Sequence, residues 1–271
     1  MTAGAIALLA VLAAAQTAGP AGTPQPAGAR TPVLVELFTS EGCSDCPPAD
    51  ALLGQLDATQ FVPGAEAIVL SEHVTYWNHD GWRDPFSLDE MTFRQQEYVQ
   101  RFGLNSSYTP QMVIDGAAQV VGNDTRAVAQ AIAHAAETPK LQMTVSDAHW
   151  AGRTVQFSVH APADSNGDLF AVLAENATHS EVKRGENAGR TLHHVAVVRV
   201  LKDFGAKAAD GRPLELPAGF HTEGTAPGDP IRLVVFLTNR KSGHVEAVAE
   251  EMLAPPSAGS PGPAPMQSSA R

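Results

Sequence analysis

Residues 33–48 read Val33-Leu34-Val35-Glu36-Leu37-Phe38-Thr39-Ser40-Glu41-Gly42-Cys43-Ser44-Asp45-Cys46-Pro47-Pro48 and carry the clearest structural signals in the chain. The apolar run at the start is typical of a buried central strand in a parallel sheet, which we predict over residues 31–38. The two prolines suit the first turn of a helix, where a missing N–H leaves no bond unmade, so a helix is predicted from about Ser44 to Asp57. Cys43 is therefore expected at a helix N-terminus, directly after a strand.

Cys43 and Cys46 are the two cysteines of this 271-residue chain. A disulfide between them would close a ring too short to stabilise much of the chain, because that stabilisation grows with loop length. The spacing suits disulfide exchange instead, in which a thiolate favoured by the helix N-terminus attacks and a second nearby thiol resolves the mixed disulfide. We assign attack to Cys43 and resolution to Cys46, with a disulfide or thiol of a partner protein or small molecule as substrate. No cofactor is expected.

The rest of the first half continues an alternation of strands and helices. The patterns predict a strand at 67–70, a helix opened by a capping box at 87–90 and ending near 101, a hairpin at 111–121, and a helix ending before Pro139. Strand, helix, strand, helix, antiparallel hairpin, helix is the order of the thioredoxin fold. We therefore expect an α/β thioredoxin-like domain over residues 31–139.

The second half has a different sequence pattern, which predicts short strands and no good helical segment. Strands are predicted at 141–145, 154–160, 169–175, 192–201, 231–238 and 244–251, separated by loops rich in Gly, Pro and Asp. This pattern favours a β-rich, sandwich-like domain over residues 140–254. Residues 255–271, rich in Pro, Gly, Ser and Ala, are expected to be a disordered tail.

The N-terminus and the net charge indicate where the protein acts. Residues 5–15 form an apolar core too short to span a bilayer, and Ala13-Ala14-Ala15 offers a cleavage site, although no basic residues precede the core. We expect residues 1–30 to be a signal peptide and linker, giving an exported, periplasmic or extracellular protein without a membrane span in its mature form. The alternative is a disordered tail on a cytosolic protein. A net charge of -11 argues against nucleic acid and anionic membrane surfaces as partners.

Two further site residues follow from the likeness to thioredoxin. In that fold a cis-proline lies against the dithiol and offers backbone to the substrate, which implies a cis peptide bond at Thr109-Pro110. That fold also places a buried acid beneath the dithiol, and Glu36 lies within the first predicted strand, where an unpartnered carboxylate would be costly. We expect Glu36 to relay protons; the alternative is a Glu that faces the surface at the strand edge.

The charge around the dithiol bears on its redox direction. Glu36, Glu41 and Asp45 make the neighbourhood acidic, and negative charge opposes thiolate formation by raising a thiol pKa. A DsbA-type oxidant depends on a stabilised thiolate, so we expect a dithiol that favours reduction of its partner.

Other interpretations stay open. Cys43 and Cys46 could bind copper or zinc with a nearby histidine, His73 or His79, in a metal-delivery module. The chain could also be a non-catalytic thioredoxin-like binding protein that keeps the dithiol as a local brace. The aromatic residues of 76–86 either form a rim that docks substrate or cover an insertion, and no chemistry is assigned to 184–190 or to His193-His194.

Three segments resemble one bacterial family of secreted, two-domain thioredoxin-like proteins of unknown function. They are residues 35–50 with the dithiol, Tyr108-Thr109-Pro110-Gln111, and Arg184-Gly185-Glu186-Asn187. The resemblance covers about residues 31–253. It implies the fold and the dithiol and leaves the substrate open.

Overall fold

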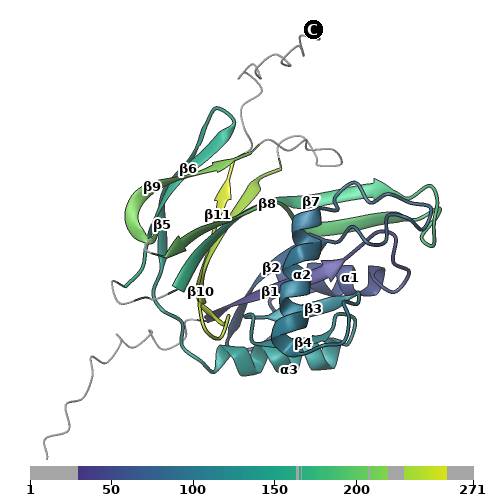
Figure 1. Cartoon of the computed structure of the whole chain (residues 1–271), viewed down its shortest axis with the longest axis horizontal. Helices are drawn as coiled ribbons and strands as arrows, with labels where there is room; N and C mark the ends of the chain where they lie inside the picture. The colour runs from purple at the N-terminus through teal and green to yellow at the C-terminus, as the bar shows by residue number, and fades with distance from the viewer. Residues whose placement is uncertain (1–29, 163–164, 166, 207, 219–228, 255–271) are drawn as a thin grey trace, which may run out of the picture.

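The computed structural model describes residues 30–162, 165, 167–206, 208–218 and 229–254 (Figure 1). The predicted signal segment, apart from Arg30, and the predicted tail at 255–271 lie outside the described residues. Among the described residues, no helix is both long and apolar enough to cross a membrane.

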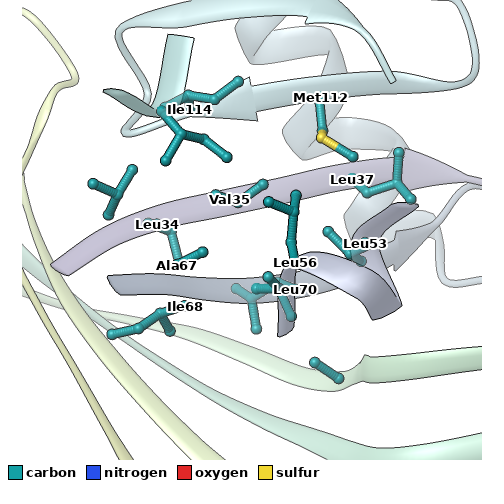
Figure 2. Close-up of a cluster of buried hydrophobic side chains, with 14 of the residues drawn as sticks. Leu34, Val35, Leu37, Leu53, Leu56, Ala67, Ile68, Leu70, Met112 and Ile114 are labelled. Atoms are coloured by element: carbon teal, nitrogen blue, oxygen red, sulfur yellow. The ribbon is translucent and has the colours of Figure 1, made fainter. Parts of the chain in front are cut away.

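The first half has the predicted order of elements. These are β1 (Thr31–Thr39), α1 (Pro47–Thr59), β2 (Ala65–His73), α2 (Asp89–Phe102), β3 (Gln111–Ile114), β4 (Ala118–Val121) and α3 (Thr125–Ala136). β1 pairs with β2 in parallel and with β3 antiparallel. Figure 2 shows where α1 packs: Leu53 and Leu56 lie against Val35 and Leu37 of β1 and Leu70 of β2 in one buried cluster.

The helix ends confirm some local signals and correct one. Asp124 caps α3, with its carboxylate accepting a hydrogen bond from the N–H of Ala127 at 3.0 Å. The capping box predicted at 87–90 is wrong, because Leu88 is the N-cap of α2 and no side chain caps it. Ser87 instead donates its hydroxyl to the carbonyl of Asp84.

The second half is built of strands. They are β5 (Thr144–Ala151), β6 (Thr154–His160), β7 (Gly167–Glu181), β8 (Thr191–Ala206), β9 (Asp210–Pro217), β10 (Ile231–Asn239) and β11 (Val245–Leu253). β9 was not predicted, because its sequence is largely polar and contains Pro213.

Both halves contribute to a single sheet of eight strands, in the order β11-β10-β7-β8-β2-β1-β3-β4. β8 joins β2 in parallel at Val197 and Ser71. One hydrophobic cluster contains Leu34 and Leu70 from the first half together with Val198 and Phe236 from the second. The predicted boundary at 139/140 therefore marks the change from mixed to all-β structure, but the two segments share one hydrophobic cluster.

A second layer, the sheet β5-β6-β9, covers the other face of β7 and β10. Because side chains alternate along a strand, Leu233 and Val235 of β10 pack in this second cluster, whereas Val234 and Phe236 pack in the first. The long hairpin of β7 and β8 extends beyond this layer, on the side of the molecule where α1 lies (Figure 1). This extension brings the loop between β7 and β8 to the dithiol.

Candidate active site

The two cysteines form a disulfide at the start of α1, with their Cα atoms 5.5 Å apart. Cys46 is the N-cap of the helix, and its carbonyl accepts hydrogen bonds from Ala49 at 2.8 Å and Asp50 at 3.1 Å. The prediction of a helix from Ser44 is wrong: α1 begins at Pro47, because proline is favoured at the first helical position. Cys46 thus lies at the helix N-terminus, and Cys43 lies in the turn before it.

Residues 182–190, which we call the cover loop, close over this turn. The side-chain amide of Asn187 donates hydrogen bonds to the carbonyls of Glu41 and Cys43, each at 2.9 Å. Glu186 accepts a hydrogen bond from the N–H of Ser44 at 3.1 Å. Cys43 is 1% exposed and Cys46 is fully buried, so the disulfide is closed off from solvent in this conformation.

The cover loop fits closely against the segment before α2. Gly185 has a φ of +78°, and a Cβ added there would lie 3.1 Å from the Cβ of Trp82 and 3.2 Å from the carbonyl oxygen of Asp80. Glycine is the residue that tolerates both this backbone conformation and this approach.

The Thr109-Pro110 peptide bond is cis, as expected. Trp77 connects this bond to the dithiol turn: its indole N–H donates to the hydroxyl of Thr109 at 2.8 Å. On the other side, a Cβ added to Gly42 would lie 3.0 Å from the Cβ of Trp77. Trp77 therefore holds the cis-proline loop and the dithiol turn together.

Glu36 is fully buried, so the alternative of a surface-facing carboxylate is wrong. It accepts hydrogen bonds from Arg94 at 2.7 Å and from the hydroxyl of Tyr98 at 2.6 Å, both on α2. Because side chains alternate along β1, Thr39 faces the opposite side, where it donates to Asp50 of α1 at 2.9 Å. The hydrogen bonds of Glu36 thus lead to α2 and not to the cysteines, and its role as a proton relay stays a prediction.

A buried charged cluster lies on the α1 side instead. His194 of β8 has its Nε2 atom 3.2 Å from Glu41 Oε1 and its Nδ1 atom 3.8 Å from Asp50 Oδ1. Glu41 also accepts hydrogen bonds from the indole of Trp82 at 2.7 Å and from Ser180. Burial alone would lower the pKa of His194, but Asp50 and Glu41 outweigh it and raise that pKa to about 10. His194 is thus a buried cation between two carboxylates.

His73 and Asp84 extend this cluster. Their Nδ1 and Oδ2 atoms lie 2.7 Å apart, and the ring of His73 meets that of His194 edge-on at 4.6 Å between centroids. Burial raises the pKa of Asp84, yet the attraction of His73 is stronger and the net pKa is lowered. Asp84 also accepts a hydrogen bond from the N–H of Glu41 at 2.9 Å, which joins this pair to the dithiol segment.

The aromatic residues of 76–86 have several roles. Phe86 is buried against His73 and His194, so it does not belong to an exposed rim. Burial raises the pKa of Tyr76 to about 12, and its hydroxyl donates to Gln95 at 3.1 Å.

A metal site has no ligand set in the described part of the chain, where no group of three or more His, Cys, Asp or Glu is arranged to hold an ion. His73 is paired with Asp84, and the exposed His79 lies beside Asp80, 3.4 Å away. The metal-delivery interpretation thus gains no support from these histidines.

Four residues at the site escaped sequence reasoning: Asp50, Glu186, Asn187 and His194. Two had a readable signal. Asp50 lies four residues after Cys46 and so on the same face of a helix, and alternation along the strand predicted at 192–201 places His194 inside if Leu192 is inside. Glu186 and Asn187 belong to a segment that carries the family resemblance, but they reach the dithiol through the pairing of β7 with β8, which no local pattern reveals.

Comparison with solved structures shows similarity over most of the chain. A crystal structure of a protein from Agrobacterium tumefaciens is 27% identical over 83% of this chain and 95% of that one, with a TM-score of 0.61. A domain of the outer membrane lipoprotein Omp28 from Porphyromonas gingivalis is 10% identical over 42% of this chain and 88% of that one, with a TM-score of 0.22. No curated protein matches the sequence. Residues 34–238 match the family DUF1223, described as a protein of unknown function, and the chain therefore belongs to this family.

Proposed function

We propose that the protein is an exported thiol:disulfide oxidoreductase with a thioredoxin-like first half. The observation that carries the proposal is the Cys43–Cys46 disulfide at the start of α1, joined through Trp77 to the cis peptide bond at Thr109-Pro110. A thiol pair at and just before a helix N-terminus is suited to exchange, since the helix end favours a thiolate nearby.

The proposed reaction passes two electrons from the dithiol to a disulfide on a partner protein or small molecule. The Cys43 thiolate attacks one partner sulfur, forms a mixed disulfide and expels the other partner sulfur as a thiolate. Cys46 then attacks Cys43, which forms the internal disulfide and releases the second partner thiolate. The partner is reduced, the dithiol is oxidised, and an external reductant restores it.

The charge of the site supports the direction towards reduction. Glu41 and Asp50 oppose a thiolate nearby, whereas His194, which the sequence interpretation had not counted, offsets one of these charges. Asp84, with its lowered pKa, adds a carboxylate beside His73. The net charge of these groups is negative or zero. Such a charge disfavours the stabilised thiolate of a strong oxidant.

A second candidate, a non-catalytic binding protein with a bracing disulfide, is favoured by the burial of both sulfur atoms beneath the cover loop. The two functions differ in how the disulfide behaves. An oxidoreductase exchanges it with substrates, whereas a brace resists reduction and turns over no disulfide.

Trapping tests the proposed function. A Cys46→Ala variant, expressed with its signal segment, should retain partners as mixed disulfides on Cys43, and a Cys43→Ala, Cys46→Ala double variant should retain none. The parent protein, kept reduced, should also reduce a model protein disulfide catalytically. The absence of both trapped partners and catalytic reduction would reject the oxidoreductase in favour of the brace. Export is tested by locating the mature protein in cell fractions.

A further inference from the structure

Two buried polar atoms of the cluster formed by His194, Glu41 and Asp50 lack a hydrogen-bond partner among the described residues. They are Oδ2 of Asp50 and Nδ1 of His194. A buried polar atom left unpaired destabilises the fold, and such atoms are rare unless they serve a second state of the protein or its chemistry. The same carboxylate has its other oxygen held by Thr39 at 2.9 Å, so Asp50 is fixed in place with one oxygen free.

Asp50 lies one helical turn below Cys46. Cys46 has helical backbone angles, and the N–H of Asp50 donates to its carbonyl at 3.1 Å, as between residues four apart in a helix. Side chains at this spacing share a face, with Cβ atoms roughly 5–6 Å apart. Cys43, in the turn before the helix, does not share this relation.

Reduction of the disulfide gives Asp50 Oδ2 a possible hydrogen-bond donor, the thiol of Cys46. In the disulfide, the sulfur of Cys46 carries no proton, so Asp50 Oδ2 has no donor there. Reduction gives Cys46 an S–H, which can donate to a carboxylate oxygen on the same helical face. The unpaired oxygen of the oxidised form thus fits a proton acceptor for the reduced form.

His194 sits behind this carboxylate. Its Nε2 atom is fixed by Glu41 at 3.2 Å, and its Nδ1 atom points to Asp50 at 3.8 Å, too long for a hydrogen bond but close enough for strong attraction between buried charges. The histidine comes from β8, so the second half of the chain supplies the countercharge for a carboxylate in the first.

We propose that Asp50 accepts the thiol proton of Cys46 in the resolving step, and that His194 is a positioning residue that stabilises the Asp50 carboxylate for this transfer. The inference rests on the proposed function. As the Cys46 proton moves to Asp50 Oδ2, the Cys46 sulfur bonds to Cys43 and the bond from Cys43 to the partner sulfur breaks. The partner leaves as a thiolate, and the proton passes from Asp50 to that thiolate or to water.

Other titratable groups surround this pair. Glu41 follows β1, His73 ends β2, Asp84 precedes α2, and Glu186 belongs to the cover loop. The test therefore compares variants that leave all four unchanged.

The test separates the two thiol reactions in time. Reduced protein is mixed with dithiobis(nitrobenzoate), an aromatic disulfide that releases one coloured thiolate when Cys43 attacks it and a second when Cys46 resolves the mixed disulfide. Asp50→Asn should slow the second release by about a hundredfold or more, the usual effect of a general base, and leave the first within about twofold. Asp50→Glu, which keeps a carboxylate, should recover part of the loss.

His194→Gln provides an independent variant, and the exposed neighbour His193→Gln is its matched control. His194→Gln should slow the second release and shift the pH at which its rate is half-maximal by about one unit. His193→Gln should change neither the rate nor this pH. Circular dichroism of the oxidised variants checks folding, and if Asp50→Asn fails to fold, His194→Gln decides.

The inference would be overturned if the folded variants release the second thiolate at an unchanged rate, or if both releases are slowed equally. The cluster would then have only a structural role. The proposed function fails separately: a parent protein that releases both coloured thiolates in a single turnover, but neither traps partners through Cys43 nor reduces a protein disulfide catalytically, would reject the oxidoreductase and leave the proton transfer standing.

Discussion

Asn187 donates a hydrogen bond from its side-chain amide to the carbonyl of Cys43 at 2.9 Å, across a sequence separation of 144 residues. The same amide binds the carbonyl of Glu41. This one side chain therefore ties the hairpin of the second half to the backbone of the dithiol turn. A disulfide on a bulky partner can reach Cys43 only if the cover loop moves.

Asn187→Ala should make the disulfide easier to reduce by a large reductant. Loss of both hydrogen bonds lowers the free-energy cost of opening the cover loop by about 1–3 kcal/mol, or roughly 5- to 150-fold in rate. The rate of reduction is measured with reduced thioredoxin and with a small phosphine, and the gain should be greater for thioredoxin. Lys183→Ala, an exposed change in the same loop, is the control; equal rates for the two variants would show that the loop does not limit access.

His194 should make stability depend on pH above neutrality. Its pKa rises from 6.5 to about 10 in the folded protein, so its contribution is fully present below 6.5 and is lost as the pH rises through 10. The parent should lose stability between pH 7 and 9 faster than His194→Gln, by up to about 1.4 kcal/mol per pH unit. Urea unfolding of both oxidised proteins gives the two slopes. Parallel slopes would mean that His194 is not a buried cation.

Arg94 should be essential for the stability of the fold, through contacts that lie away from the dithiol. Its guanidinium binds Glu36 and lies 3.5 Å from Glu72, both fully buried, and burial together with the charge of Glu36 raises the pKa of Glu72 well above its usual range. Arg94→Met leaves Glu36 without its counterion and should cost about 3–5 kcal/mol in unfolding free energy.

Glu36→Gln in the Arg94→Met background tests the cause of that loss. Removing the unpaired charge should recover part of the stability, measured by urea unfolding as before. A double variant no more stable than Arg94→Met would indicate that the loss comes from packing against the rings of Phe170 and Phe236, which the guanidinium also contacts.

The features that the sequence predicts correctly depend on residues that lie close together along the chain. The apolar run of β1 and the hairpin of β3 and β4 are local signals, and each element appears where expected. The helix predicted from about Ser44 begins at Pro47, because proline is favoured at the first helical position. The cover loop and His194 reach the site through the register of β7 with β8 and of β8 with β2, which depends on long-range pairing.

The domain boundary shows the same limit. The hydrophobic periodicity detects the change from mixed to all-β structure at 139/140. It does not reveal that strands before and after this boundary pair in one sheet. Val234 and Phe236 read as an ordinary buried strand, and the cluster they enter is known only from the fold.

The redox potential tests the electrostatic argument directly. With Glu41 and Asp50 beside the dithiol and His194 offsetting one charge, we expect a potential nearer that of thioredoxin, about −270 mV, than that of DsbA, about −120 mV. Glu41→Gln removes one buried negative charge while the histidine remains, which favours the thiolate and should raise the potential by about 30 mV or more. Equilibration with glutathione and dithiothreitol gives both values, and the exposed Glu66→Gln serves as the control. A parent potential close to that of DsbA would contradict the direction proposed here, because it would require a strongly stabilised thiolate that this set of charges does not supply.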